Sequence, residues 1–296
     1  MKKVAIIGVG NVGAHIASAA VNKNLAAEFL LVDQNQEFET AQVLDLCDSL
    51  LFSHNSRVYA ADFTDKKVQN ADIFVITAGV NQKPGETRLN LVGRNVAILK
   101  SIKKSLRTLK PSAIVILVTN PVDILATLAA EIFELPSSQV FGSGTLLDTA
   151  RLRWRLARKF DKNISNIHGY VLGEHGDSEF VAWSTVDGAD KISRDSREKI
   201  AKLVREEAYK IIAGKGATYF GIGAATAEII SAILNNSEKV FPLSVLLNGE
   251  YGISGISIGV PAKLGEKGIM QVIELNLSKE ELAKLQDSAK KLKGFI

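Results

Sequence analysis

A glycine-rich segment near the start of the chain constrains the possible fold more than any other feature. The apolar run from Lys3 to Ile7 is typical of a buried parallel strand, and it leads directly into Gly8-Val9-Gly10-Asn11-Val12-Gly13. The glycines allow a tight turn, close approach of a pyrophosphate and close packing of the following helix. The pattern alone is weak evidence, but here a helical stretch follows it as far as Asn22. We therefore predict a dinucleotide site lined by Gly8, Gly10, Val12 and Gly13.

A carboxylate at the end of the next strand indicates which dinucleotide binds. The apolar run Phe29 to Val32 ends in Asp33, which follows the glycine segment at the spacing typical of a ribose-binding acid. Such a carboxylate accepts hydrogen bonds from both ribose hydroxyls and repels a 2′-phosphate. The next residues, 34–36, contain no arginine that could neutralise that phosphate. The sequence predicts NAD as cofactor, with an ordinary turn residue as the alternative for Asp33.

Short apolar runs and helical patterns alternate over the first part of the chain. A helical pattern spans residues 38–52, and further strands are expected at 58–60, 73–77 and 114–118. This alternation predicts an α/β fold of the Rossmann type, a doubly wound parallel sheet in an NAD-binding domain of residues 1–143.

Small and polar residues follow two of these strands. Ala78 and Gly79 come after the strand at 73–77, and Asn120 comes after the strand at 114–118. In a doubly wound sheet the ligand lies outside the carboxyl ends of the strands, so we predict that Ala78, Gly79 and Asn120 line the dinucleotide site. Turn chemistry at a strand end is the alternative for each.

The segment 81–88 is interpreted as a mobile loop. It contains a Pro-Gly pair and leads into a helical stretch from Leu89 onward. Loops of this composition at the mouth of a scaffold often close over a substrate. We expect Arg88 to polarise a substrate carbonyl on closure and Gln82 to contact the far end of the substrate. A solvated surface arginine is the alternative.

A histidine in a glycine-rich segment is the main candidate for acid/base chemistry. His175 lies in Gly173-Glu174-His175-Gly176-Asp177, and the upstream pair Asp148 and Arg151 has the i, i+3 spacing that places both side chains on one helix face. One member of that pair can orient the imidazole while the other binds an anion. A hydrogen-bonded structural histidine is the alternative.

The second half of the chain is predicted to form an α+β substrate domain of residues 144–296. Helices are expected at 194–214 and 224–235, and strands at 240–247, 253–260 and 269–273. Ser278 and Glu281 have the spacing of a capping box, which predicts the start of a terminal amphipathic helix.

Five motifs together resemble those of the lactate and malate dehydrogenase family, in order and in spacing. They are the glycine loop with Asp33, Gln-Lys-Pro-Gly-Glu-Thr-Arg, Val-Thr-Asn-Pro-Val-Asp, Gly-Thr-Leu-Leu-Asp-Thr-Ala-Arg and Gly-Glu-His-Gly-Asp-Ser. The resemblance covers essentially the whole chain and is closest to the bacterial L-lactate dehydrogenases. It implies an enzyme that reversibly reduces pyruvate to L-lactate with NADH. The single cysteine and the short apolar run at the start of the sequence predict that this enzyme is cytoplasmic.

The resemblance also implies roles for individual residues. His175 would be the proton donor and acceptor, Asp148 its orienting partner and Arg151 the clamp for the substrate carboxylate. Arg88 would be the lid arginine. The remaining implied contacts to nicotinamide or substrate are those of Asn120, Thr218 and Ile222.

The choice of substrate depends mainly on Gln82. Within the family, arginine at this position implies the second carboxylate of malate, whereas glutamine implies an uncharged side chain. Thr218 also resembles the lactate-type residue, so a small 2-oxo or 2-hydroxy monocarboxylic acid such as pyruvate is expected. However, residues 179–186 look more like those of the 2-hydroxyisocaproate dehydrogenases, so branched 2-oxo acids remain an alternative.

A second anion site is expected on the other side of the 148–151 helix. Arg153 is two residues beyond Arg151 and therefore faces away from the substrate. Arg153 and His168 match the positions where allosteric members of the family bind fructose bisphosphate between subunits. The resemblance thus implies activation by this sugar phosphate and a homotetramer. A surface arginine and a strand histidine are the alternatives.

Composition excludes several other classes. The 296 residues include one cysteine, so no intrachain disulfide can form, and no apolar run is long enough for a membrane span. The net charge is +4, but no basic run is interleaved with aromatic residues, so we expect no nucleic-acid binding. No Cys/His cluster has metal-ligand spacing. A non-catalytic NAD-binding regulator is the alternative of another class, but Arg88, Asp148, Arg151 and His175 are all present.

Overall fold

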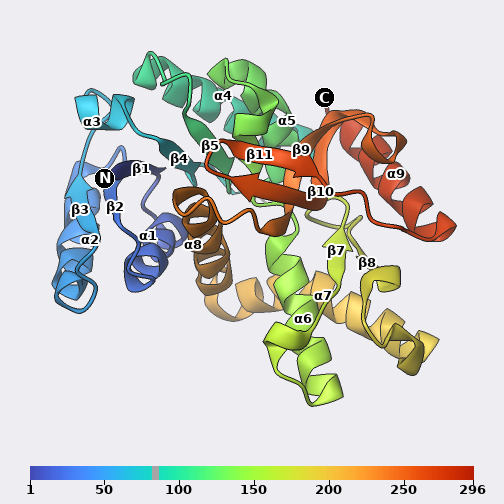
Figure 1. The fold of residues 1–296 in the computed structure, drawn as a ribbon. Coiled ribbons are helices and arrows are strands. Elements are labelled where there is room, and N and C mark those ends of the chain that lie inside the picture. The colour runs from blue at the N-terminus through green and yellow to red at the C-terminus, as the bar shows by residue number, and fades with distance from the viewer. Residues whose placement is uncertain (82–86) are drawn as a thin grey trace.

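The computed structural model describes residues 1–81 and 87–296, apart from the side chain of Arg88. The described chain forms a nine-stranded sheet with helices on both faces and a smaller two-stranded sheet at one side (Figure 1). Six strands of the large sheet are parallel, in the order β3-β2-β1-β4-β5-β6. They are β1 (Lys2–Ile7), β2 (Ala27–Val32), β3 (Arg57–Ala60), β4 (Ile73–Ile76), β5 (Ile114–Leu117) and β6 (Val140–Gly142). This is the predicted Rossmann arrangement, and the strand order reverses between β1 and β4.

Both faces of the parallel sheet are buried, as the continuous apolar strands predicted. Val4, Ile6 and Val75 point into one core, whereas Ala5 and Ile76 point into the other. The helices of this half are α1 (Asn11–Asn22), α2 (Gln36–Asp48), α3 (Lys66–Gln69), α4 (Arg88–Leu106) and α5 (Val122–Phe133), and a 3-10 turn (Ser49–Phe52) extends α2.

The large sheet continues into the second half of the chain. Its further strands are β9 (Val240–Asn248), β10 (Ser254–Gly265) and β11 (Gly268–Val272), and they form an antiparallel meander. β9 pairs antiparallel with β6 through Gly142 and Ser244. The sheet therefore crosses the boundary predicted after residue 143, and that boundary stays a prediction.

Residues 146–215 of the second half project to one side of the large sheet (Figure 1). β7 (Tyr170–Leu172) and β8 (Phe180–Ala182) form an antiparallel hairpin. Leu152, Val171, Val181 and Val204 form a separate core between this hairpin and its helices. The helices of this half are α6 (Leu146–Phe160), α7 (Arg194–Lys215), α8 (Phe220–Leu234) and α9 (Lys279–Lys293).

Helix α8 begins four residues before the predicted start at 224. The sequence pattern concealed this turn because Gly221 and Gly223 are poor helix formers. Packing overrides that propensity. A Cβ on Gly223 would lie 3.0 Å from the backbone of His15 in α1, and a Cβ on Gly221 would lie 2.7 Å from a methyl of Leu147 in α6. The glycines thus let the first turn of α8 fit between α1 and α6.

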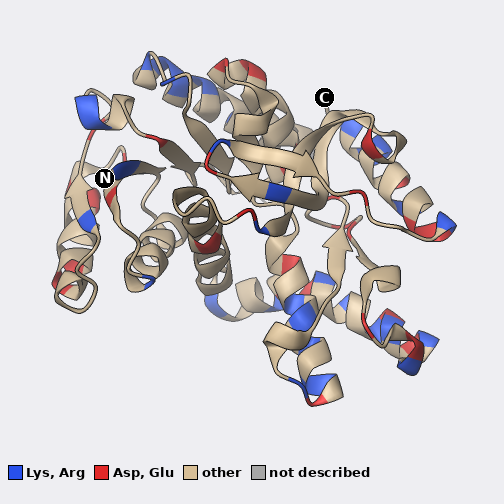
Figure 2. Cartoon of the chain, viewed as in Figure 1, with Lys and Arg blue, Asp and Glu red and all other residues tan. Residues whose placement is uncertain are grey.

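The predicted capping box at the start of α9 is present. The Ser278 hydroxyl accepts a hydrogen bond from Glu281 N at 3.2 Å, and the Glu281 carboxylate accepts one from Ser278 N at 2.9 Å. Two N–H groups at the helix start are thereby satisfied. Lys, Arg, Asp and Glu are interleaved along α7 and α9 (Figure 2). Among the described residues, no helix is both long and apolar enough to cross a membrane.

Candidate active site

A cavity of about 540 Å³ lies where the strand order reverses, at the carboxyl ends of β1, β2 and β4. This is the position at which doubly wound sheets bind their ligands. Its wall includes these residues from the predicted cofactor set: Gly8, Gly10, Val12, Gly13, Asp33, Ala78 and Gly79. Ala217, from the loop before α8, also lines it.

The glycine segment is shaped to receive a phosphate. Gly8 has φ +91°, and a Cβ on Gly13 would lie 1.9 Å from the Gly8 carbonyl oxygen, so side chains at these positions would force the turn apart from the helix. A Cβ on Gly10 would meet no protein atom within 4 Å. Gly10 caps α1 without a side-chain hydrogen bond, so the N–H groups of the first turn remain available to an anion. The residues fit a pyrophosphate.

Asp33 holds the glycine segment as well as facing the cavity. Its Oδ2 accepts a hydrogen bond from Val9 N at 2.8 Å, and its Oδ1 accepts one from Asn35 N at 3.1 Å. A carboxylate has about four lone-pair sites, so acceptors remain for two ribose hydroxyls. The side chain is half-buried at the end of β2. Its position fits the adenosine side of a dinucleotide.

The remaining predicted cofactor residues, Asn120 and Ile222, do not line this cavity. Asn120 is exposed, and its carbonyl oxygen accepts a hydrogen bond from Asn95 Nδ2 at 2.8 Å. The same Asn95 side chain pairs with the backbone of Val80 through both its oxygen and its nitrogen. Asn95 thus ties the segments after β4 and β5 together. Sequence reasoning missed this residue because it lies inside an ordinary helical pattern.

The histidine, aspartate and arginine singled out in the sequence come together in one buried cluster. His175, in the loop between β7 and β8, shares a hydrogen bond of 2.6 Å between its Nδ1 and Asp148 Oδ2. Arg151 Nη1 donates to Asp148 Oδ1 at 2.7 Å. Asp148 therefore uses one oxygen for each cation. Since an ionised carboxylate can only accept, the Nδ1 atom carries the proton and Nε2 is left for another partner.

The surroundings of His175 favour its charged form. Burial alone would lower its pKa, but the charge and hydrogen bond of Asp148, together with the charges of Glu179 and Asp123, outweigh burial and raise the pKa to about 9. Burial likewise opposes ionisation of Asp148, yet His175 and Arg151 hold the pKa of that carboxyl below its usual value. The side chain of His175 is 24% exposed, so a ligand can reach the ring although Asp148 and Arg151 are buried.

The backbone of the histidine loop is held by a second aspartate. Asp123, in the first turn of α5, accepts a hydrogen bond from His175 N at 2.7 Å and another from the Ser244 hydroxyl at 2.6 Å. Its side chain is buried, and burial raises its pKa to about 6 despite both hydrogen bonds. Asp123 belongs to the Val-Thr-Asn-Pro-Val-Asp motif, but the motif gave no sign that it reaches the histidine loop.

Two further acidic residues of the loop had no assigned role. Glu174 is buried, its N–H donates to the Ser288 hydroxyl of α9 at 2.9 Å, and its carboxylate accepts from the Ser178 hydroxyl. Glu179 is 6% exposed. One oxygen of Glu179, one of Asp148 and one ring nitrogen of His175 all lie within 4.8 Å of one another. The only available sequence signal for both glutamates was their closeness to His175.

Thr218 and Ile222 come from the loop before α8 and from the first turn of α8. Thr218 is half-buried in the loop before α8, next to the cavity-lining Ala217, and Ile222 is half-buried in the first turn of α8. That turn packs between α1 and α6, which carry the glycine segment and Asp148 respectively. The implied contacts of Thr218 and Ile222 with substrate and nicotinamide stay predictions.

Arg153 and His168 lie on a different side of α6 from Arg151. Arg153 Nε donates to the Gly169 carbonyl at 3.1 Å, and its guanidinium lies 5.2 Å from the centre of the Tyr170 ring. His168 is exposed and directly precedes Gly169. Gln82 and the side chain of Arg88, by contrast, lie outside the described residues, so their predicted roles stay predictions.

Comparison with family models matches nearly the whole chain. Residues 2–142 match the NAD-binding domain of the lactate/malate dehydrogenases, and residues 145–296 match their α/β C-terminal domain. The first match agrees with the cavity lined by the glycine segment and Asp33.

Similar proteins cover the chain from end to end. It is 41% identical to L-lactate dehydrogenase 2 of Enterococcus faecalis, over 100% of this chain and 96% of that protein. It is 42% identical to L-lactate dehydrogenase 1 of Listeria monocytogenes, again over 100% and 96%. The minor L-lactate dehydrogenase of Enterococcus mundtii superposes with a TM-score of 0.93 at 41% identity, over 99% and 97% of the two chains. A lactate dehydrogenase from a Medee basin deep-sea metagenome gives the same TM-score at 39% identity, with the same coverage. The fold, the NAD-binding domain and these relatives agree that the chain belongs to the lactate/malate dehydrogenase family.

Proposed function

We propose that the protein is an L-lactate dehydrogenase, which reduces pyruvate to L-lactate with NADH and runs the reverse reaction with NAD. The observation that carries this proposal is the Asp148–His175 hydrogen bond with Arg151 on the same carboxylate. This arrangement supports the proposal, because reduction of a 2-oxo acid needs a proton donor close to a group that binds the substrate carboxylate.

The glycine segment and Asp33 would hold NADH, and bound NADH would supply the hydride for the carbonyl carbon of the substrate. His175 donates the proton to the carbonyl oxygen from Nε2, while Asp148 fixes the ring through Nδ1 and stabilises the imidazolium. One substrate molecule thus takes up one hydride and one proton. In the reverse direction the neutral ring accepts the proton of the lactate hydroxyl.

Arg151 binds the substrate carboxylate in this proposal. Its guanidinium is buried and has five N–H donors, of which one contacts Asp148, while its Nε lies 3.8 Å from Glu207. The planar fork suits a carboxylate, which accepts two parallel hydrogen bonds. Arg88 and Gln82 complete the proposed site: Arg88 polarises the carbonyl, and Gln82 disfavours a second carboxylate.

The names of the relatives support pyruvate over malate, and Gln82 supports the same choice. The test is kcat/KM with NADH for pyruvate, 4-methyl-2-oxopentanoate and oxaloacetate. A large preference for pyruvate is expected. Preference for the branched acid would make the protein a 2-hydroxyisocaproate dehydrogenase with the same mechanism, and no NADH oxidation with any of the three would mean a non-catalytic NAD-binding protein.

We also propose that the protein is a cytoplasmic homotetramer activated by fructose bisphosphate at Arg153 and His168. Arg153 donates a hydrogen bond to the carbonyl of Gly169, the residue next to the exposed His168, so both side chains belong to one segment of the protein. Saturation curves for pyruvate with and without fructose bisphosphate test the activation, and sedimentation under the same conditions tests the assembly. Unchanged curves for the native protein at both acidic and neutral pH would reject the activator.

A further inference from the structure

Glu179 is a buried carboxyl group next to the acid/base cluster, and the proposed mechanism gives this carboxyl group no role. It directly precedes β8 and is 6% exposed, and one of its oxygens lies within 4.8 Å of both His175 and Asp148. The groups that act on its charge are Asp148 and Arg151 from α6, His175 from its own loop and Arg205 from α7. A second carboxyl in this position affects the charge of a site that must accept an anion.

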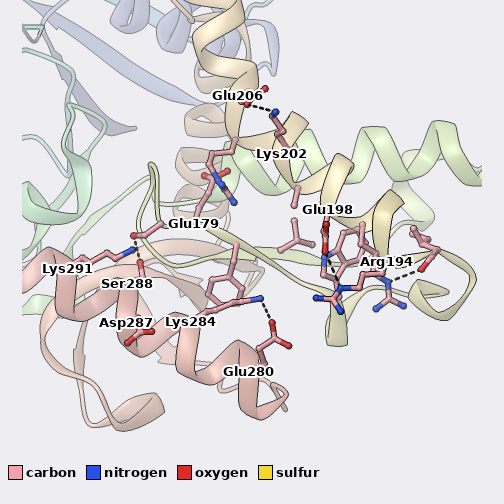
Figure 3. A pocket seen from close by; sticks show the side chains of 18 residues that line it. Glu179, Arg194, Glu198, Lys202, Glu206, Glu280, Lys284, Asp287, Ser288 and Lys291 are labelled. Carbon is pink, nitrogen blue, oxygen red and sulfur yellow. Dashed lines mark hydrogen bonds and ion pairs between the residues drawn. The ribbon is translucent and has the colours of Figure 1, made fainter.

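Glu179 also lines a large cavity. This cavity has a volume of about 1020 Å³ and lies between the hairpin, α7 and α9 (Figure 3). Its wall carries both signs of charge, and the acidic groups on α7 and α9 have cationic neighbours: Glu206 lies near Lys202, and Glu280 near Lys284. Lys291 and Asp287 of α9 line it too. Protons can therefore move between Glu179 and solvent through this cavity, which is separate from the cofactor cavity.

The environment favours the uncharged form of Glu179. Burial is the main cause, the negative charge of Asp148 adds to it, and His175, Arg151 and Arg205 act in the opposite direction, so that the pKa of Glu179 is raised to about 8. His175 in turn faces the carboxyls of Asp148, Glu179 and Asp123. Protons on Glu179 and His175 are therefore linked, and they leave in two steps that belong to the pair.

Each proton lost from this pair lowers the net charge by one beside the place where Arg151 must bind a carboxylate: Glu179 becomes negative, or His175 loses its positive charge. In a poorly hydrated site such a charge is only weakly screened. We propose that Glu179 is a positioning residue whose protonated form is required for binding of the 2-oxo acid, so that substrate binds with two protons on the cluster, one on His175 and one on Glu179. This inference rests on the proposed function, since it concerns the anion which that function places at Arg151.

A metal ion at Asp148, His175 and Glu179 is a poorer explanation of the same cluster. The oxygens of Asp148 already hold the Arg151 guanidinium and the His175 ring, and a fixed cation at 2.7 Å repels a metal ion. Full activity of the wild-type protein in the presence of a chelator is the expected result, and loss of activity that Zn²⁺ or Mn²⁺ restores would overturn our assignment.

The test counts protons. For reduction of pyruvate, log(kcat/KM) of the wild type should fall with a slope approaching about −2 above pH ~9, because both protons are required. In Glu179→Gln, which mimics the protonated acid, the slope should be about −1, because only the proton on His175 remains. Glu206→Gln is the matched control. It makes the same chemical change at a partly exposed position on the same cavity, and it should keep the wild-type slope.

A binding measurement provides the second readout. Oxamate resembles pyruvate but cannot accept a hydride, so its binding to the protein–NADH complex can be followed with a pH indicator. At about pH 9 the wild type should take up more than one proton per oxamate bound, whereas Glu179→Gln should take up at most one. A purely structural role for Glu179 would not change this number.

A further variant covers the case in which Glu179→Gln fails to fold. Arg205 is exposed and favours ionised Glu179, so in Arg205→Gln the decline of kcat/KM should begin at higher pH than in the wild type. A wild-type slope of about −1 with full activity would overturn the role of Glu179 alone, since one proton would then suffice. Absence of NADH oxidation at every pH would overturn the proposed function and this inference together.

Discussion

The cofactor cavity and the acid/base cluster are built in different ways, although both lie along the carboxyl edge of the same sheet. Among the described residues, the glycines and the Asp33 carboxylate of the first β-α-β unit line one part of the cavity, and apolar side chains such as Phe63 and Ile102 line another. The cluster consists of buried charged side chains from α5, α6 and the β7–β8 loop, which are far apart in the sequence. Backbone contacts depend on shape, whereas buried charges depend on their partners and on pH. The two regions should therefore respond to different perturbations.

The sharpest test of this difference is His175→Gln. Without the proton donor, kcat for pyruvate reduction should fall by roughly 10³-fold or more. NADH affinity, measured by fluorescence, should stay within about twofold, because the cavity does not include His175. His54→Gln, an exposed histidine, is the control and should keep full activity. A large loss of NADH affinity in His175→Gln would show that the two regions are not independent.

Arg151→Lys tests the cluster at its carboxylate-binding member. A lysine keeps the charge but cannot make two parallel hydrogen bonds, so kcat/KM should fall by roughly 10²-fold. Arg155→Lys is the matched control. Arg155 lies on the same helix and pairs with Glu207 at 2.5 Å, but it makes no contact with Asp148 among the described residues. Near-normal affinity for pyruvate in Arg151→Lys would defeat the clamp assignment.

The pH dependence should separate the two regions without any mutation. The pKa of His175 is raised to about 9, so the imidazolium that reduction requires is present below this pH and is lost as the pH rises through it. Reduction should then lose at least about tenfold in kcat/KM per further pH unit, whereas lactate oxidation, which needs the neutral ring, should gain with pH up to the same value. NADH affinity should not follow this profile. A flat profile for reduction between pH ~7 and ~10 would contradict the role of His175.

Asp33→Asn is the corresponding test of the cofactor cavity. Loss of the charge should weaken NADH binding by about tenfold and reduce the discrimination against NADPH, because the 2′-phosphate is no longer repelled. kcat at saturating NADH should change little. Asp45→Asn, at an exposed position on α2, should leave both cofactors unaffected. Unaltered cofactor preference in Asp33→Asn would argue against a ribose contact.

The smallest effect is expected from Ser278→Ala. Helix α9 supplies Ser288 to the histidine loop but contributes nothing to the wall of the cofactor cavity. Loss of the cap should lower the free energy of unfolding by about 1 kcal/mol, seen as a fall of a few degrees in Tm. Kd for NADH should be unchanged. Destabilisation by several kcal/mol would mean that α9 and the histidine loop unfold as one unit.

The parts of the fold and site that could be predicted from sequence are those that depend on short segments. The parallel strands, the glycine turn and Asp33 lie within one β-α-β unit, and the i, i+3 spacing of Asp148 and Arg151 places both side chains on one helix face. That these residues meet His175 was predicted from the chemistry of the residue types and from the family resemblance, and not from any spacing in the sequence. The structure brings the three together.

The features that could not be predicted depend on contacts between distant segments. Asp123 reaches a backbone N–H 52 positions away, and Ser288 reaches one 114 positions away. Neither contact leaves a periodicity or a spacing in the sequence. The early start of α8 was missed for a related reason, because its glycines lower helix propensity but fit against α1 and α6.

The pairing of β6 with β9 has a consequence for how the chain folds during synthesis. Gly142 and its partner Ser244 are separated by about a hundred residues, and until β9 is made the outer side of β6 has no partner strand. An unpaired strand edge of apolar residues is a site where chains associate with one another. At ~5–20 residues per second, the ribosome needs at least several seconds to deliver β9. During this interval the unpaired edge of β6 in one nascent chain can associate with that in another, so high expression should favour aggregation.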